Sequence, residues 1–202
     1  MRCAPKKSRL SSRQLRRWAW LLLLLLPAAC QPKPPAPPAR AAAAPAPAGQ
    51  LTARGALALA EKEAQTWNPG ALLAEILSGD DIGESGTSDY WEFHFVDPGM
   101  QNKLVVVVQA GGVKPAQGGR LAAPVPALPG DWLDSKAAYQ KSVAAFFAHH
   151  PDPQTFQPAW LTCDSRYSPT PHWTMLFTQP RHLPVGAMID AKSGAFLGEL
   201  SR

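Results

Sequence analysis

A tract rich in proline and alanine near the N-terminus limits what this chain can fold into. Residues 32–49 read PKPPAPPARAAAAPAPAG. Proline restricts φ and favours extended polyproline II of about 3.1 Å per residue, and the tract has no large apolar side chains with which to build a core. The folded part therefore begins near Leu51, and residues 51–202 are enough for one ordinary domain or two half-domains that share a core.

The segment before this tract is basic, then apolar, and ends in a cysteine. Its apolar part, Trp18–Leu26, leads through Pro27-Ala28-Ala29 to Cys30, and it follows a basic region with Lys6, Lys7, Arg9, Arg13, Arg16 and Arg17. At about 1.5 Å per residue, the stretch up to Cys30 is shorter than the ~30 Å hydrocarbon core that a spanning helix must cross. The pattern resembles a bacterial lipoprotein signal peptide, although Pro27 stands where that family usually has leucine.

This resemblance implies a lipid-anchored protein of the cell envelope. Residues 1–29 would be the signal peptide, Cys30 the lipidation site that carries palmitate-type acyl chains, and residues 30–50 a disordered stalk between the membrane and the folded part. Gln31 is similar to the residue found in lipoproteins sorted to the periplasmic side of an outer membrane, where the organism has one. Plain secretion and an uncleaved anchor remain alternatives, but Pro45 disfavours ordinary cleavage after Ala44.

The charge balance changes once the signal segment is set aside. Residues 1–29 carry seven of the 20 Lys and Arg and none of the 15 Asp and Glu, so the chain from Cys30 onward has a formal net charge of −2. A basic footprint is absent from this part, which argues against nucleic acid as a partner. Cys163 would be the one free thiol of the folded part, and we expect it to be a half-buried small hydrophobe on a strand.

Hydrophobic periodicity predicts two helices, each followed by strands. Thr52 can cap a helix that runs to about Trp67, with Leu57, Ala60 and Ala64 on its apolar face. A second helix is predicted over Asp134–Ala148, with Tyr139, Val143, Phe146 and Phe147 on its apolar face. The predicted strands are Leu72–Leu77, Tyr90–Val96, Lys103–Gln109, Phe156–Cys163, His172–Thr178, Val185–Asp190 and Phe196–Leu200.

The two halves of the folded part match each other. A shift of 82 residues places Trp91 on Trp173 and Phe95 on Phe177, and it also brings Pro98 onto Pro180 and Gly112 onto Gly194. We therefore predict an α+β fold with two tandem units, residues 51–128 and 129–202, each a helix with an antiparallel sheet. The alternative is a chance likeness between two amphipathic strand patterns.

A short motif near the C-terminus carries a family resemblance. Residues 188–197 read MIDAKSGAFL, which resembles the closing hairpin of a PepSY-type module. Asp190 can accept hydrogen bonds from turn amides, and Gly194 tolerates a positive φ. The first half departs from the motif, since it has Gln109-Ala110-Gly111-Gly112 at the matching place. The resemblance implies an exported, noncatalytic protein that binds or restrains peptidases or other envelope proteins.

Residue patterns for catalysis or metal binding are weak. His149 and His150 are adjacent at a helix end, where their side chains diverge. The other candidates are His94, His172 and His182, which lack a companion at ligand spacing, and the acidic loop residues Asp80, Asp81 and Glu84. We therefore expect no catalytic residues, no metal site and no cofactor.

The sequence favours binding over catalysis. The favoured function is a noncatalytic, lipid-anchored envelope protein that binds a protein, peptide or small ligand through two long connections, Gly79–Asp89 and Gly111–Leu128. The alternative is an envelope hydrolase or metal-dependent enzyme that uses dispersed histidines and acids. The five tryptophans of the folded part are predicted to lie in the core, with a ligand groove as the alternative.

Overall fold

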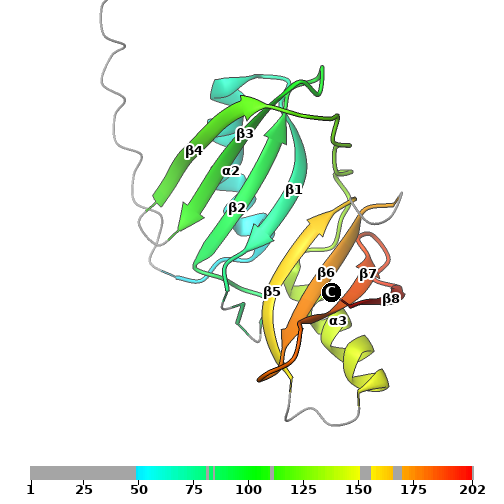
Figure 1. The fold of residues 1–202 in the computed structure, drawn as a ribbon. Helices are drawn as coiled ribbons and strands as arrows, with labels where there is room; N and C mark the ends of the chain where they lie inside the picture. Colours follow the sequence, from blue (N-terminus) through cyan, green and yellow to red (C-terminus); the bar gives the residue numbers. More distant parts are fainter. Residues whose placement is uncertain are drawn as a thin grey trace, which may run out of the picture. The chain divides into compact units, whose positions relative to one another are not determined.

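The structure, a computed structural model, describes residues 49–80, 82–83, 85–109, 112–150, 156–165 and 170–201. These ranges do not include Cys30, most of the stalk, Asp81 or Glu84. The described elements are α2 (Ala53–Trp67), β1 (Leu72–Ser78), β2 (Tyr90–Val96), β3 (Asn102–Gln109), β4 (Gly112–Arg120), α3 (Ser135–His149), β5 (Gln157–Asp164), β6 (His172–Thr178), β7 (Val185–Asp190) and β8 (Phe196–Ser201) (Figure 1). The predicted α+β class is confirmed.

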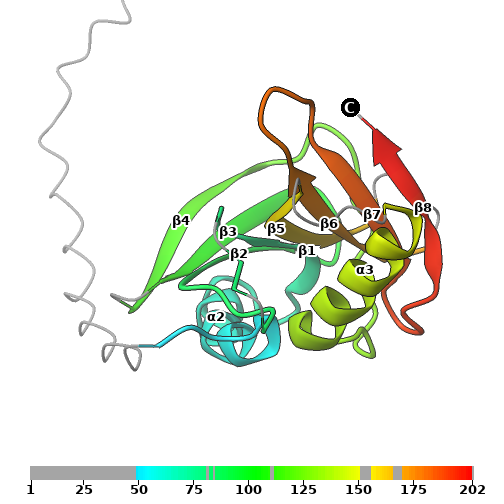
Figure 2. The ribbon, with the colours of Figure 1, turned by 90° about the horizontal axis from the view of Figure 1, so that it is seen from below.

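The strands form one antiparallel sheet of eight, in the order β4-β3-β2-β1-β5-β6-β7-β8. Each half of the chain supplies a helix and then four consecutive strands. The halves meet where β1 pairs with β5, and this seam has only two register pairs, Ile76 with Cys163 and Leu77 with Thr162. Both helices lie on the same side of the sheet, α2 against β2–β4 and α3 against β5–β8 (Figure 2).

Helix α2 begins and ends where its sequence predicts. Thr52 is the N-cap, and its side chain accepts a hydrogen bond from the Gly55 amide at 3.3 Å. The expected apolar residues Leu57, Ala60 and Ala64 are buried against the sheet. Asn68 ends the helix because its backbone turns to an extended conformation there. Small buried alanines let this helix approach the sheet closely.

Helix α3 is shifted by one residue from the prediction, with Asp134 as its N-cap. Tyr139 and Phe146 of its predicted apolar stripe are buried, and Val143 and Phe147 are half-buried. The Phe146 ring stacks on Phe177 of β6, with ring centroids 3.9 Å apart. Aromatic packing therefore fixes this helix on the second half of the sheet.

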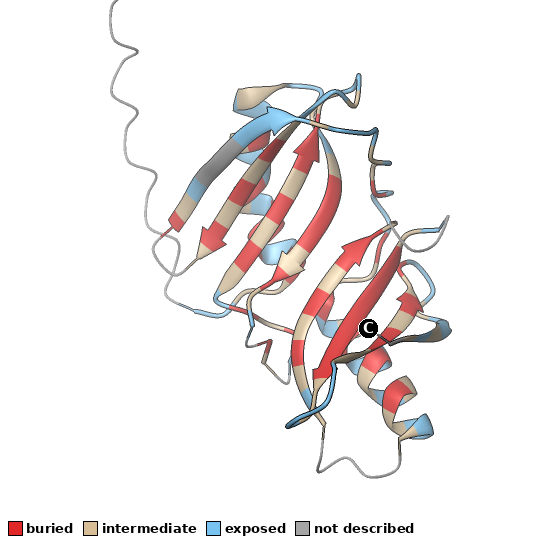
Figure 3. Cartoon of the chain, in the orientation of Figure 1, coloured by how far each residue is buried: buried red, intermediate tan, exposed pale blue. Residues whose placement is uncertain are grey.

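Successive side chains of a strand point to opposite faces of the sheet, so every second one lies in the core between the sheet and the helices. In β2, Trp91, Phe93 and Phe95 are buried, and the residues between them are half-buried (Figure 3). Trp173 in β6 is also buried, so the expectation that Trp91 and Trp173 lie in the core is confirmed. Of the remaining tryptophans, Trp132 is buried and Trp67 and Trp160 are half-buried.

The prediction of an irregular connection over Gly111–Leu128 is wrong in its first part. Gly112–Arg120 forms the edge strand β4, which pairs with β3 along its whole length. Glycine and proline are typical of loops. An edge strand tolerates them because the backbone groups on its outer side need no hydrogen-bond partner in the sheet. A register shift between Val105 and Val106 accommodates the irregular stretch. Only the residues after Arg120 remain irregular, and among them the Leu128 amide donates to the Leu73 carbonyl at 2.7 Å.

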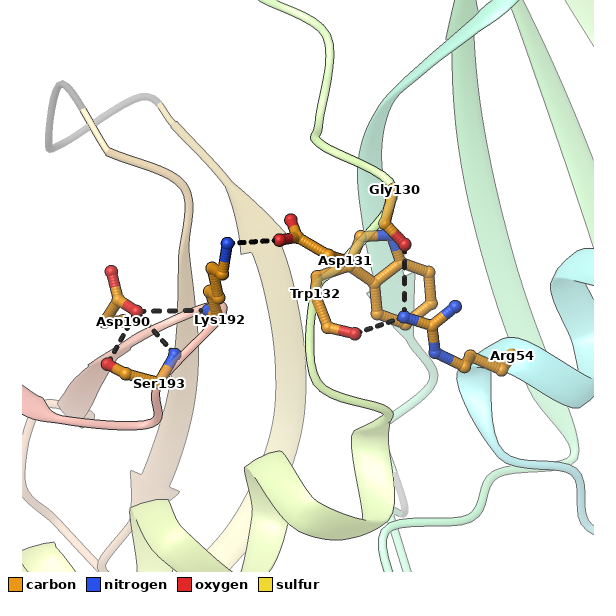
Figure 4. Close-up of polar contacts among 7 residues, drawn as sticks. All are labelled: Arg54, Gly130, Asp131, Trp132, Asp190, Lys192 and Ser193. Carbon is orange, nitrogen blue, oxygen red and sulfur yellow. Dashed lines mark hydrogen bonds and ion pairs between the residues drawn. The ribbon is translucent and has the colours of Figure 1, made fainter.

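The segment before α3 is fixed on both sides by polar contacts (Figure 4). The Arg54 guanidinium of α2 donates to the carbonyls of Trp132 and Gly130 and lies 4.1 Å from the centroid of the Trp132 ring. On the other side, Asp131 forms an ion pair with Lys192 in the turn between β7 and β8, at 2.5 Å. Residues 130–132 therefore connect the first helix to the last hairpin.

The turn between β7 and β8 has the local structure that its motif predicts. Asp190 accepts hydrogen bonds from the Lys192 amide at 3.1 Å and the Ser193 amide at 2.7 Å (Figure 4). Gly194 has a φ of +72°, which is strained for any residue with a Cβ. The predicted roles of Asp190 and Gly194 are confirmed.

Candidate functional site

The candidate site lies on the face of the sheet that the described helices leave uncovered, which we call the helix-free face. In the first half its residues are half-buried, among them Tyr90, Glu92 and His94 of β2 and Val105 and Val107 of β3. They alternate with the core residues, because side chains of a strand point to opposite faces in turn. The first half thus presents a mixed apolar and polar surface.

Four side chains form a hydrogen-bonded row across this face, which we call the Glu–His–Glu row. The Glu75 Oε2 atom of β1 lies 2.8 Å from His94 Nδ1, and His94 Nε2 lies 2.5 Å from Glu92 Oε1. The Tyr90 hydroxyl donates to the other oxygen of Glu92 at 3.0 Å. Both ring nitrogens of His94 therefore face a carboxylate.

A β-bulge places Glu75 in this row. The register between β1 and β2 shifts between Leu73 and Glu75, which leaves Ala74 as the extra residue, and Ala74 is buried. A bulge of this kind re-aims the following side chain, and Glu75 lies opposite His94 as a result. Its side chain is 11% exposed and that of His94 is 19% exposed, so water screens their interaction only partly.

The electrostatics of the row favour a protonated imidazole. Burial lowers the pKa of His94, but the hydrogen bonds and charges of Glu75 and Glu92 raise it by more, so the pKa lies above its ordinary value of 6.5. Only the imidazolium form can donate from both ring nitrogens at once. Burial and the hydrogen bond to Glu92 likewise raise the pKa of Tyr90. The row then holds two carboxylates and one cation, a net charge of −1.

The row is arranged to hold a proton, because each ring nitrogen of His94 already has a carboxylate as its partner. Within the described ranges, no group of three or more His, Cys, Asp and Glu side chains is placed to hold a metal ion. An exposed hollow of about 400 Å³ borders the row, and its lining residues are Ser78, Gly79, Asp80, Asp89 and Tyr90. Asp80, one of the loop acids singled out by the sequence, therefore lies beside the row.

The other histidines do not join this site. His150 Nε2 lies 2.9 Å from Glu199, and His149 stacks on Phe196 with ring centroids 5.1 Å apart, so both adjacent side chains contact β8 rather than the row. His172 is buried at the start of β6, and His182 is exposed in the turn after that strand.

Cys163 is buried more completely than expected. The sequence predicts a half-buried side chain, but Cys163 of β5 has no exposed surface. It lies beside the seam, opposite Ile76 of β1, where both halves of the core cover it. Burial, and secondarily the charge of Asp164, raise the pKa of its thiol well above the ordinary value. The thiol is therefore a core group of low reactivity.

The Glu–His–Glu row is not among the predicted sites, although the sequence carries two signals for it. Glu92 and His94 are two residues apart in a strand, which places them on the same face. Glu75 is the one charged residue in the apolar run Leu72–Leu77, and such a residue needs a partner when it is half-buried or buried. Neither signal has the residue spacing of a metal-ligand motif.

No protein-family model and no curated protein matches this chain. Among solved structures, it is similar to the crystal structure of a protein from Clostridium difficile 630 that is provisionally described as a lipoprotein. The sequences are 12% identical, the TM-score is 0.52, and the match covers 71% of this chain and 90% of that one. At this identity the likeness shows the fold alone. Because neither half makes up 71% of this chain, the likeness extends over both halves.

The helices of the described residues include none that is long and apolar enough to cross a membrane.

Proposed function

We propose that this chain is a noncatalytic, lipid-anchored protein of the bacterial cell envelope that binds another envelope protein on the helix-free face of its first half. The observation that carries the proposal is the combination, on β2 and β3 of the first half, of the Glu–His–Glu row with half-buried valines. The outward residues His172, Thr174 and Leu176 of β6 are buried, whereas those of β2 and β3 are half-buried. Outward residues of β5, among them Trp160 and Thr162, are also half-buried, but they are uncharged. The first half is therefore distinguished by an ionic row beside apolar surface.

The shape and charge of this surface favour a polypeptide partner. A small-molecule site usually encloses most of its ligand, but the hollow beside the row is open to solvent along its acidic rim of Asp80 and Asp89. The half-buried Val105 and Val107 of β3 offer apolar contact area next to the net negative Glu–His–Glu row. A protein surface that presents apolar side chains and a basic group would match both features.

We further propose that residues 51–128 and 129–202 are tandem copies of one PepSY-like unit. The Trp91 indole donates to the Leu51 carbonyl at 2.8 Å, and the Trp173 indole donates to the Leu133 carbonyl at 2.9 Å, each over 40 residues. Each first strand also has a bulge before its outward residue, at Ala74 in β1 and at Ala159 in β5. Chance likeness of amphipathic strands does not explain matched bonds and bulges.

Lipid attachment is tested by Cys30→Ala. Two acyl chains contribute about 0.8 kcal/mol per buried CH₂, enough for stable anchoring, so the wild-type protein is expected in the membrane fraction and the variant in the soluble fraction. Mass spectrometry of Cys30 reports the modification directly. A wild-type protein that is soluble and has an intact Cys30 thiol would contradict the anchoring and leave plain secretion.

Binding is tested with photo-crosslinking residues at Val105 or Val107 and, as a control, at exposed Gln65 of α2. We expect one envelope protein to be crosslinked from the two β3 positions and not from Gln65. That protein, once purified, should bind the wild-type chain and lose affinity for Val107→Lys. Crosslinking from Gln65 alone, or equal binding by Val107→Lys, would refute the proposed surface.

One observation favours the alternative of an envelope hydrolase: His94 is oriented by carboxylates, as general bases are. Its ring nitrogens face Glu75 and Glu92 rather than a hydroxyl or thiol nucleophile, which is why we favour binding. Hydrolysis of peptide or ester substrates by the purified chain, lost in His94→Gln, would establish the alternative.

A further inference from the structure

We propose that the Glu–His–Glu row is a proton-controlled tie between β1 and β2: protonated His94 fastens β1 in place, and loss of the proton loosens β1, the strand on which the two halves of the sheet meet.

The tie lies where the backbone pairing between β1 and β2 is interrupted. The bulge at Ala74 breaks the regular register between Leu73 and Glu75. Immediately after it, Glu75 reaches across to His94 Nδ1 at 2.8 Å, and the other ring nitrogen is held by Glu92 at 2.5 Å. A side-chain ion pair thus joins the two strands beside a weak point of their ladder.

The same stretch of β1 carries the seam. Ile76 and Leu77, the two residues after Glu75, supply both register pairs with β5. One further bond spans the seam, since Ser78 accepts a hydrogen bond from the Leu161 amide at 2.8 Å. Because two register pairs join β1 to β5, a shift of β1 at Glu75 acts directly on this seam.

The charges around His94 come from four strands. Glu75 lies on β1, and Glu92 and Tyr90 lie on β2 with His94 itself. On β3 the direct neighbour of His94 is Val105, and the charged residue on that side is Lys103, two pairs further along. On β4, Lys114 lies opposite Val107. Helix α2 packs on the other face of these strands. The groups in contact with the imidazole are therefore anionic, and the lysines are more distant.

The sign of the pH effect follows from these contacts. Burial lowers the pKa of His94, and the two glutamates raise it by more, so the folded-state pKa exceeds the ordinary value of 6.5. A group with a raised folded-state pKa contributes its full stabilisation below the unfolded-state value and loses it as the pH rises through the folded-state value. The tie is therefore closed in acid and opens on the alkaline side. Each unit of pKa difference changes the equilibrium constant of unfolding about tenfold.

The experiment compares the full wild-type chain with His94→Gln between pH 5 and pH 9, using His150→Gln as a matched control. His150 also pairs with a glutamate, at 2.9 Å, but on α3 and away from the seam. The readouts are the NMR titration of His94 and the hydrogen exchange of residues 72–78, corrected for the intrinsic effect of pH. In the wild type and in His150→Gln we expect exchange of this segment to rise, about tenfold per unit of pKa difference, as the pH passes the folded-state pKa. In His94→Gln exchange should be fast at every pH.

A His94 that titrates at or below 6.5 would overturn the proposal, and so would exchange of residues 72–78 that does not depend on the state of His94. If His94→Gln does not fold, Glu75→Gln takes its place. That variant removes one of the two carboxylates, so His94 should titrate at a lower pH than in the wild type and residues 72–78 should begin to open at that lower pH. An unchanged titration in Glu75→Gln would equally refute the tie.

Discussion

A single buried hydroxyl joins the start of α2 to the start of α3, and its removal gives a sharp test of the fold. Ser135 is fully buried, and its Oγ accepts a hydrogen bond from the Ala53 amide at 2.8 Å. The same hydroxyl donates to the Gly86 carbonyl at 2.7 Å. The Ser135 hydroxyl is therefore the hydrogen-bond partner of two backbone groups, a helix N-terminal amide 82 residues away and a loop carbonyl.

Ser135→Ala should destabilise the protein by about 2–4 kcal/mol. The substitution leaves the Ala53 amide and the Gly86 carbonyl without this partner, and a buried polar group left unsatisfied costs about 1–3 kcal/mol. Two such groups would together cost about 2–6 kcal/mol. Relaxation of the loop carbonyl toward another partner and the helix propensity of alanine, worth about 0.5 kcal/mol, place the expected loss in the lower part of that range. Urea unfolding followed by tryptophan fluorescence measures the loss, because three tryptophans, Trp91, Trp132 and Trp173, are buried.

Ser142→Ala is the matched control. Ser142 lies on the same helix and is also fully buried, but in the described part of the chain its hydroxyl has no hydrogen-bond partner. Its removal should be neutral or slightly stabilising, within about 0.5 kcal/mol. Equal losses in the two variants, or a loss below ~0.5 kcal/mol in Ser135→Ala, would refute the role given to the Ser135 hydrogen bonds.

Two further predictions concern core and turn positions. Trp91→Ala and Trp173→Ala should each destabilise the protein by about 3–5 kcal/mol in urea unfolding, since both side chains are large and buried. A small loss at one of the two positions would contradict the view that they are equivalent positions of two repeated units. Gly194→Ala should destabilise by about 1–2 kcal/mol, because φ is +72° there and the added Cβ would also press on the Lys141 side chain. Gly119→Ala, with no atom within 4 Å of the added Cβ, should change stability by less than ~0.5 kcal/mol. Similar melting shifts for the two glycine variants would contradict this difference.

Local patterns in the sequence are enough to predict most of the described elements. Thr52 and Asn68 mark the two ends of α2, and the alternation from Trp91 to Phe95 fixes β2, because these signals depend on near neighbours. Strand β4 is different. Its glycines and proline indicate a loop, and it becomes a strand only because the free edge of β3 offers a partner. That pairing is not encoded in the local residue pattern.

The candidate site shows the same division between local and distant information. The pair Glu92 and His94 can be found from their spacing in one strand. The third member, Glu75, comes from another strand, and its place opposite His94 depends on the bulge at Ala74. A sequence pattern gives the face of a residue but not the register between strands, so the complete row requires the structure.

The same scaffold position has different chemistry in the two halves. In the first half, the residue after the bulge is Glu75, and it pairs with His94. In the second half, the corresponding residue is Trp160, and it pairs with Leu176. In the apolar pair Leu176 is 2% exposed and Trp160 is half-buried. The ionic pair requires partial access to water to limit the penalty of desolvation, and His94 remains 19% exposed. The bulge position of the first half therefore places charge on the outer face of the sheet, and both the proposed binding surface and the proposed tie depend on that charge.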